Sequence, residues 1–333
     1  MRPDLKAVLG AIRRHRSPYT AVLPYNLNWL DRDWSGIDQQ LNTHPIRVID
    51  VGSRGGSLLE LECLRKYIEY FGFDADPDAE PPTGYARQTI ISQFVGTLDG
   101  TTTFNIFNIP GESSALKPNP AYRKFSPAFD IAKTIEVRST TLDSLYLAGV
   151  ITDVDMIKLD TQGTEYEILS NATNLVSRAF LIETEVEVFP MYEGQKLFHH
   201  VSDLLYRQGF MLVYLNRVFA SRASCKVRSR GQMIFGDALF ALSPERAHIL
   251  PLEKKFKLVV CLIQYGLLDY AQELFEMDEG LKNFAPQLAR VFILQKRRRS
   301  RVATWIDKLV LLLLFWRQTN HLAWDSDRSW PIR

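Results

Sequence analysis

The sequence has few cysteines: Cys63, Cys225 and Cys261 are its three, and no two of them form a CxxC pair. Their wide separation excludes a disulfide framework and a zinc site built on paired cysteines, and it fits a reducing compartment. The N-terminal residues 1–20 also lack an apolar stretch of signal-peptide length. We therefore expect a cytoplasmic protein.

An excess of charge of either sign is absent as well. The chain has 40 basic and 38 acidic residues and a formal net charge of +2, so its overall field does not recruit a polyanion, and no nucleic-acid partner is predicted. What the sequence does have is 333 residues with 46% hydrophobic content, enough for one large domain with an appendage.

The pattern of residues changes twice along the chain. Residues 1–45 show no sustained periodicity, and we interpret them as an N-terminal extension lying over the domain. Residues 46–243 alternate short apolar runs with helix-like segments, which indicates a parallel sheet with crossover helices. Residues 244–333 are rich in Leu, Lys, Arg and Gln and have few turn signals, which predicts a helical C-terminal region.

The central part predicts a doubly wound, mostly parallel α/β sheet of seven strands. An amphipathic helix is expected at residues 57–68, after the first strand, and the final strand is interpreted as an antiparallel one at an edge of the sheet. The strand-like segments are 46–51, 70–74, 88–96, 101–109, 134–139, 154–160, 180–188, 210–215 and 232–242.

The first strand ends in a glycine-containing turn, VIDVGSRGG at 48–56. Glycines between a strand and a helix let the backbone approach a ligand closely. Arg54 stands where a dinucleotide fingerprint has its second glycine, which argues against tight contact with a pyrophosphate. Asp74 ends the next strand, where such domains place a carboxylate against ribose hydroxyls. Together these features favour an adenosine cofactor without a pyrophosphate, and S-adenosylmethionine fits this description.

Acidic residues gather at the ends of two later strands. Asp160 follows the strand 154–160 and precedes the turn at Gly163, and Glu165 lies in the first turn of the next helix. Glu183 lies on the following strand, on the same face as Glu185 and Glu187. A row of acids is costly to bury unpaired, so we expect some of it to meet solvent, a cation or a substrate.

Several motifs in the same order resemble the FkbM-type methyltransferase family over residues 46–242. The motifs are VIDVGSRGG, FDADP (73–77), TLDSL (141–145), KLDTQGTEYEIL (158–169), IETEVEVFPMYEGQ (182–195) and QGF (208–210). The resemblance implies a class I methyltransferase fold and methyl transfer from S-adenosylmethionine, generally to oxygen on sugars or natural-product scaffolds.

The resemblance also implies roles for individual positions in binding the cofactor. Asp74 would bind the ribose hydroxyls, and Asp99 would lie near the adenine. The positions expected at the methionine and ribose portion are Asp50, Gly52, Ser53 and Gly56.

The chain also departs from the family pattern at two places. The family usually has Ala-Asn where this chain has Ser53 and Arg54, and Arg54 could supply a cation to the methionine carboxylate. The family often has Glu where this chain has Gln162, which puts in doubt any role that needs a carboxylate there.

We expect Asp160, Glu165 and Glu183 to face the methyl acceptor, with one as general base or all three sharing a divalent ion. Structural interpretations stay open for each of them: orienting the loop, stabilising the first helical turn or pairing with Lys158. The adjacent His199 and His200 are another source of a base.

The expected activity is therefore O-methylation of a hydroxyl on a sugar, glycan or glycosylated natural product. Transfer to nitrogen or to a carboxylate on the same fold is an alternative, and so is a degenerate member that only binds the cofactor or assembles with other proteins.

The basic run KRRRSR and the apolar stretch after it, together residues 296–316, leave two interpretations open. The stretch is shorter than the roughly 20 residues that span a bilayer. The segment could contact anionic lipids at the inner face of the membrane, near a lipid-linked glycan. We favour the other interpretation, a buried helix in a helical domain or in the seam of a homo-oligomer.

Overall fold

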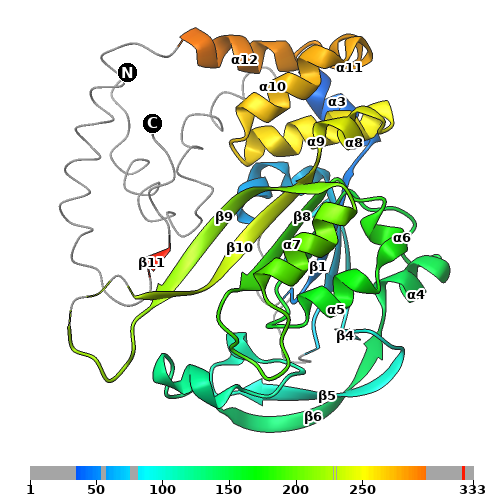
Figure 1. Ribbon diagram of the computed structural model, residues 1–333. Coiled ribbons are helices and arrows are strands. Elements are labelled where there is room, and N and C mark those ends of the chain that lie inside the picture. The colour runs from blue at the N-terminus through cyan, green and yellow to red at the C-terminus, as the bar shows by residue number, and fades with distance from the viewer. Residues whose placement is uncertain are drawn as a thin grey trace.

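A computed structural model of the chain describes residues 35–53, 58–75, 82–227, 229, 231–297 and 325–326. Within these ranges the chain forms a central sheet, a smaller second sheet at one end of it and a group of helices at the other end (Figure 1). The predicted site residues Arg54 and Gly56 lie outside the described residues, as does nearly all of the segment 296–316.

The central sheet confirms the predicted doubly wound, mostly parallel α/β fold. Its strands run in the order β11-β9-β10-β8-β7-β1-β2-β3, and β8, β7, β1, β2 and β3 pair in parallel. The strands are β1 (Ile46–Val51), β2 (Ile68–Phe73), β3 (Arg87–Ile91), β7 (Met156–Leu159), β8 (Leu181–Glu187), β9 (Phe210–Ala220), β10 (Gln232–Leu242) and β11 (Asp325–Ser326).

The position predicted for the last long strand is wrong. Strand β10 is antiparallel as expected, but it lies between β8 and β9 and not at an edge. Strands β9 and β10 follow one another along the chain and form a hairpin, so β9 becomes the outer member of the pair. The two-residue strand β11 then pairs with β9 and adds an eighth strand to the seven that were predicted.

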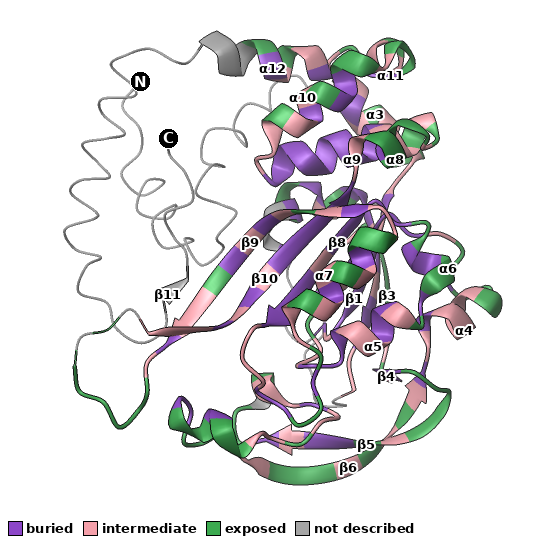
Figure 2. Ribbon diagram, viewed as in Figure 1, coloured by how far each residue is buried: buried purple, intermediate pink, exposed green. Residues whose placement is uncertain are grey.

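The segments predicted as strands at 88–96 and 101–109 do not form one continuous sheet. Residues 87–91 join the central sheet, whereas β4 (Phe94–Val95), β5 (Gly100–Phe107) and β6 (Ile131–Thr140) form a separate sheet in the order β4-β6-β5. Much of β6 is exposed (Figure 2). This small sheet lies beyond the carboxyl ends of the parallel strands and forms one wall of the pocket described below.

The helix predicted at 57–68 is a 3-10 helix, η2 (Leu59–Tyr67), and not an α-helix. Its buried side chains explain the difference, because Leu58, Leu61, Leu64 and Tyr67 are spaced by three residues and all are at most 5% exposed. A spacing of three places side chains on one line of a helix with three residues per turn. An amphipathic α-helix, as expected from the sequence, would instead repeat its buried positions about every 3.6 residues.

Short helices connect the remaining strands, and α5 and α7 lie against one face of the sheet (Figure 1). They are η3 (Pro110–Glu112), η4 (Pro120–Lys124), α4 (Leu142–Leu147), α5 (Glu165–Ser170), α6 (Thr173–Val176) and α7 (Phe198–Arg207).

The region predicted as an N-terminal extension contains a helix that the periodicity analysis missed. Helix α3 (Ser35–Thr43) precedes β1 and buries Ile37 and Leu41, which are one helical turn apart. Two buried positions in nine residues are too few to stand out in a sequence. Residues 1–34 lie outside the described ranges.

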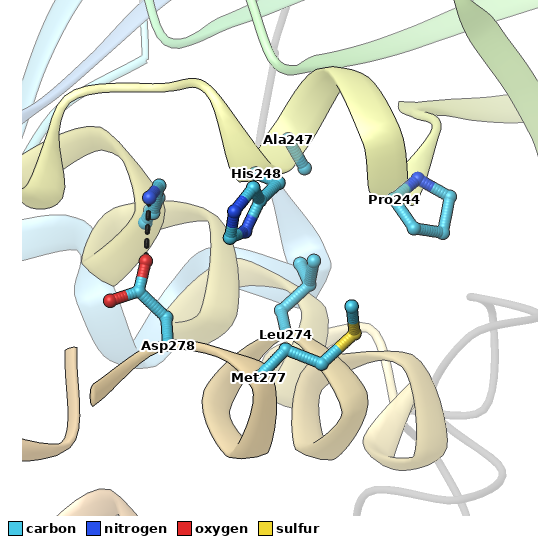
Figure 3. A pocket seen from close by; sticks show the side chains of 7 residues that line it. Pro244, Ala247, His248, Leu274, Met277 and Asp278 are labelled. Atoms are coloured by element: carbon cyan, nitrogen blue, oxygen red, sulfur yellow. Dashed lines mark hydrogen bonds and ion pairs between the residues drawn. The ribbon is translucent and has the colours of Figure 1, made fainter. Parts of the chain in front are cut away.

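Helices α8 to α12 occupy the amino-terminal end of the parallel strands (Figure 1). Residues 256–264 of α9 are all buried, and they belong to the same hydrophobic core as the sheet (Figure 2). A small cavity between α8 and α10, about 10 Å³, is too tight for an organic ligand (Figure 3). The helices are α8 (Pro244–His248), α9 (Leu252–Gln264), α10 (Leu268–Met277), α11 (Glu279–Phe284) and α12 (Leu288–Arg297).

A buried ion pair fixes α9 to the start of β7. Lys257 Nζ lies 2.5 Å from Asp155 Oδ2, and the two side chains are 5% and 0% exposed. The same carboxylate accepts a hydrogen bond from the backbone N–H of Arg47, at 2.9 Å, in β1. Asp155 therefore joins the helical region to two strands of the sheet.

We expect Lys257→Met to lower the free energy of unfolding by about 3 kcal/mol, because it leaves the Asp155 charge buried with fewer partners. Urea unfolding measures this. Lys282→Met removes a lysine whose partner Glu279 is 81% exposed, and it should cost less than about 1 kcal/mol. Equal losses in the two variants would contradict the structural role of the buried pair.

Candidate functional site

A pocket opens where the parallel strands end and the second sheet begins. Its floor is the carboxyl ends of β1, β2 and β7, and its walls include Phe94 and Phe104 from the small sheet and the loop at Gly111–Ser113. Strands β2 and β7 lie on opposite sides of β1. The sheet therefore grows outward from β1 through β2 and β3 on one side and through β7 and β8 on the other. Open α/β sheets bind their ligands at such a switch point.

Gly52 lies in the floor of this pocket and contributes only backbone atoms to it. Its φ is +82°, a conformation that favours glycine, and a Cβ built on it would lie 1.9 Å from the carbonyl oxygen of Asp160. The N–H groups of Gly52 and Ser53 both donate to the carbonyl of Phe73, each at 2.9 Å. The glycine is therefore required by the close approach of β1 to the residue after β7, and its backbone lines the pocket.

Two of the predicted carboxylates line this pocket. Asp74 follows β2, and Asp160 follows β7 and is exposed. They stand at the tips of strands that flank β1, which is the arrangement expected from the sequence, and Gly52 lies between them in the strand order. The residues present fit an adenosyl ligand with one acid for its ribose and a second acid near the reacting end.

Asp50 and Ser53 lie beneath the pocket and do not line it. Asp50 is fully buried, accepts a hydrogen bond from Tyr70 at 2.7 Å and pairs with Lys158 Nζ at 3.0 Å. Ser53 is 2% exposed. These two residues therefore support the strand end, and their predicted contact with the cofactor stays a prediction.

Lys158 compensates the charges in this part of the sheet. Burial by itself lowers its pKa, but the charges of Asp50, Asp160 and Glu183 outweigh this and raise the pKa above the ordinary value. Lys158 lies in register with Asp50 on β1 and with Glu183 on β8. One cation on the middle strand thus faces an acid on each neighbouring strand.

Asp99 lies in the turn before β5 and connects it to α4. Its carboxylate accepts hydrogen bonds from the Thr140 hydroxyl at 3.0 Å, the Thr141 backbone at 3.2 Å and the Ser144 hydroxyl at 2.6 Å. The bonds from Ser144 and Thr140 lower its pKa. Asp99 is not among the lining residues, and its place near the adenine stays a prediction.

The three acids predicted to face the acceptor are not equivalent. Asp160 reaches the pocket, whereas Glu165 is 2% exposed and accepts bonds from the Thr161 backbone, the Thr161 hydroxyl and the Gly163 backbone at 2.7 to 3.0 Å. Glu183 accepts a bond from Tyr265 of the helical region at 2.6 Å. The geometry gives Glu165 a role in shaping the loop and places Glu183 away from the lining residues.

Burial raises the pKa of this group of glutamates. The pKa values of Glu165 and Glu183 rise to about 7, and those of Glu185 and Glu187 rise well above the ordinary value. Burial is the largest cause for each, and neighbouring acids add to it. At neutral pH the site therefore holds protons on part of its carboxyl groups.

The loop at 110–113, which borders the pocket, contacts the loop that carries Tyr192. The Tyr192 hydroxyl contacts the carbonyl of Glu112 and the side-chain oxygen of Gln162, each at 2.9 Å. Burial raises the pKa of Glu112 to about 7. The sequence offers both segments as loops that could border the acceptor, but the contact between Glu112 and Tyr192 is not readable from it, because it depends on tertiary pairing such as the isolated bridge between Pro118 and Tyr192.

The histidine pair does not reach the pocket. The rings of His199 and His200 lie 3.9 Å apart, and His200 Nδ1 accepts a hydrogen bond from the Leu197 backbone at 3.2 Å, at the start of α7. Neither residue lines the pocket. The geometry gives His200 a role in the helix terminus and offers no support for a histidine base.

The described residues contain no group of three or more His, Cys, Asp or Glu side chains arranged to hold a metal ion. Nor does any helix in these ranges combine the length and apolar character needed to cross a membrane.

The buried glutamates predict how stability depends on pH. Because their pKa values are higher in the folded chain, they stabilise the fold at a pH below the unfolded value near 4.5, and this contribution is lost as the pH rises through about 7. We expect the free energy of unfolding of the ligand-free protein to fall between pH 5 and pH 7.5, as measured by urea unfolding. Glu183→Gln should flatten this fall, and the exposed Glu193→Gln should not. A curve for Glu183→Gln that parallels the wild type would argue against the assignment.

Comparisons with known structures give weak similarities. They include magnesium protoporphyrin IX methyltransferase from Synechocystis with bound SAM (TM-score 0.33, 14% identity, 73% of this chain and 87% of that one). A precorrin-6y C5,15-methyltransferase from Geobacter metallireducens gives a TM-score of 0.29 at 10% identity, covering 61% and 87% of the two chains. Scores this low carry no information about the ligand or substrate of this chain. No curated protein matches the sequence significantly.

The match to a family model is informative, and it covers β2 to β8, the residues that line the pocket and the acidic loop after β7. Residues 50–212 match the model of the methyltransferase FkbM domain. The chain therefore carries the domain of the FkbM-type, S-adenosylmethionine-dependent methyltransferases.

Proposed function

We propose that this methyltransferase acts on a hydroxyl of a sugar, a glycan or a glycosylated natural product. The observation that carries the proposal is the exposed carboxylate of Asp160 in the pocket, beside the glycine backbone of β1 and backed by a group of buried acids. A hydroxyl is a weak nucleophile, and it gains from a carboxylate that accepts its proton during attack.

The cofactor half of the pocket is assigned to S-adenosylmethionine. We assign Asp74 to the ribose hydroxyls, and we assign the backbone at Gly52 to the methionine and ribose portion. When bound, the cofactor supplies a methyl group on a positively charged sulfur. Arg54 and Gly56, outside the described residues, keep their predicted roles at the methionine end.

The acceptor half favours a neutral group over an anionic one. Glu185 and Glu187 are buried, and both, together with Glu112 of η3, lie near the Tyr192 hydroxyl. An anionic acceptor would add a further negative charge beside Asp160 and beside carboxyl groups whose pKa values burial already raises, and a site of low dielectric penalises this. A hydroxyl meets no such barrier, and its proton has an acceptor in Asp160. The same field admits an amine, so methylation of nitrogen is the second candidate.

The wider setting of the enzyme is part of this proposal. A cytoplasmic location is proposed from the sequence pattern alone. For residues 296–316 a buried helix, in a helical domain or in the seam of a homo-oligomer, stays the favoured interpretation, and contact with anionic lipids near a lipid-linked glycan stays the alternative. The domain boundaries 1–45, 46–243 and 244–333 are proposed on the same basis, although the helices after 243 share one core with the sheet.

Two substitutions separate cofactor binding from chemistry. We expect Asp74→Ala to weaken the binding of S-adenosylmethionine by at least about tenfold, since a charged hydrogen-bond partner of the ribose is lost. Asp160→Asn should leave that affinity nearly unchanged and lower kcat by about 10² to 10⁴. Calorimetry and steady-state kinetics measure the two effects. Unchanged affinity in the Asp74 variant would remove the ribose assignment.

The acceptor class can be tested with labelled S-adenosylmethionine and a panel of monosaccharides, nucleotide sugars, amino sugars and sugar acids. We expect label in hydroxyl-bearing sugars, held through mild base because a methyl ether resists hydrolysis. Release of the label by base would show an ester and exclude hydroxyl methylation. Label confined to amino sugars would favour nitrogen as the acceptor, and absence of cofactor binding would favour a degenerate member of the family.

A further inference from the structure

The loop after β7 has an unusual backbone at Gln162. Its φ is +58°, and no other non-glycine residue within the described ranges has a positive φ. Such a conformation costs roughly 1 kcal/mol or more for a residue with a side chain. The hydroxyl of Ser114 donates to the Gln162 carbonyl at 2.7 Å, and Ser114 is fully buried. The surrounding structure therefore holds Gln162 in a conformation that the residue does not favour by itself.

The side chain of Gln162 makes three hydrogen bonds in this conformation. Its Nε2 donates to Asp160 Oδ1 at 2.7 Å and to Glu185 Oε2 at 2.5 Å. Its Oε1 accepts from the Tyr192 hydroxyl at 2.9 Å. A flipped amide would put its oxygen against two carboxyl groups, so the chemistry of the partners fixes the orientation. The amide thus joins a pocket acid, a buried acid and the loop that carries Tyr192.

The groups around this amide are almost all acidic. Glu185 from β8 is 7% exposed, and burial raises its pKa, helped by the charges of Asp160, Glu187 and Glu165. Lys158 on β7 is the cation nearest in register, and it pairs with Asp50. The raised pKa of Glu185 means that its carboxyl group holds its proton more readily than an ordinary glutamate. A neutral amide can bridge the two without adding charge.

We propose that Gln162 is a positioning residue whose amide holds Asp160 against Glu185 and keeps the Asp160 carboxylate turned toward the methyl acceptor. The inference rests on the proposed function of Asp160 as the group that accepts the acceptor's proton. It gives a reason for the costly backbone conformation, because in that conformation Nε2 reaches both acids and Oε1 reaches Tyr192.

The first experiment needs no acceptor and tests the electrostatic part of the proposal. The thermal unfolding of ligand-free wild type, Gln162→Glu and Asn119→Asp is followed at pH 5.5 and pH 8.5. Asn119→Asp is a matched change of amide to acid, at an exposed cap of η4. We expect a third acid at 162 to have a raised pKa, so its cost grows with pH. The Tm difference from wild type should be several degrees larger at pH 8.5 for Gln162→Glu only. Equal differences at both pH values would overturn the bridge between the acids.

The second experiment tests positioning, with S-adenosylmethionine and a sugar that accepts label. Gln162→Leu should lower kcat at least about tenfold at every pH, with the KM for the cofactor nearly unchanged, because Asp160 loses its orientation. Gln162→Glu should move the rising limb of the pH–rate profile up by about one unit, because a third acid raises the pKa of the group. The proposal would be overturned if the pH–rate profile of Gln162→Glu matched that of the wild type and Gln162→Leu kept the wild-type kcat.

The outcomes also separate this inference from the proposed function. If Asp160→Asn retains full activity, the proposed function fails, whatever the Gln162 variants do. If Asp160→Asn loses activity but both Gln162 variants match the wild type, the proposed function stands and the positioning role fails.

Discussion

The site depends on the close approach of two neighbouring strand ends. The backbone N–H of Asp160 donates to the carbonyl of Val51 at 2.9 Å, and no side chain fits between Gly52 and the Asp160 carbonyl. This contact places Asp160 directly beside Gly52 in the lining of the pocket. Any shift between β1 and β7 would separate these two lining residues.

A buried ion pair within the sheet holds β1 and β7 together next to this contact. Asp50 and Lys158 lie opposite each other in the register of β1 and β7 and are joined at 3.0 Å. Such a pair adds little net stability relative to an apolar pair, but it penalises other registers, because a shifted strand would leave a buried charge alone. The pair therefore contributes mainly to the geometry of the strand ends above it.

The described residues around Asp160 include several carboxyl groups, with Lys158 as the cation in register beside them. Burial raises the pKa of Glu165 and Glu183 to about 7 and that of Glu185 and Glu187 well above the ordinary value, while Asp160 lines the pocket. Gln162 and Tyr192 connect these acids to the loops that border the pocket. The helical region is linked to the same polar layer from the other side, because Tyr265 donates to Glu183. Burying this many carboxyl groups lowers the stability of the fold, and groups with strongly shifted pKa values are typical of functional sites.

The sequence by itself determined the α/β class, the cofactor family and the positions of Gly52, Asp74 and Asp160 at strand ends. These follow from local patterns: apolar runs, glycines after a strand and acids where a strand stops. The tertiary structure alone decided that β10 lies inside the sheet, that Asp50 is buried under the pocket and that Tyr192 contacts both Glu112 and Gln162. Such contacts join residues 80 and 30 positions apart in the chain, and they depend on which strand lies beside which. Periodicity shows which face of an element is buried, but not what lies against it.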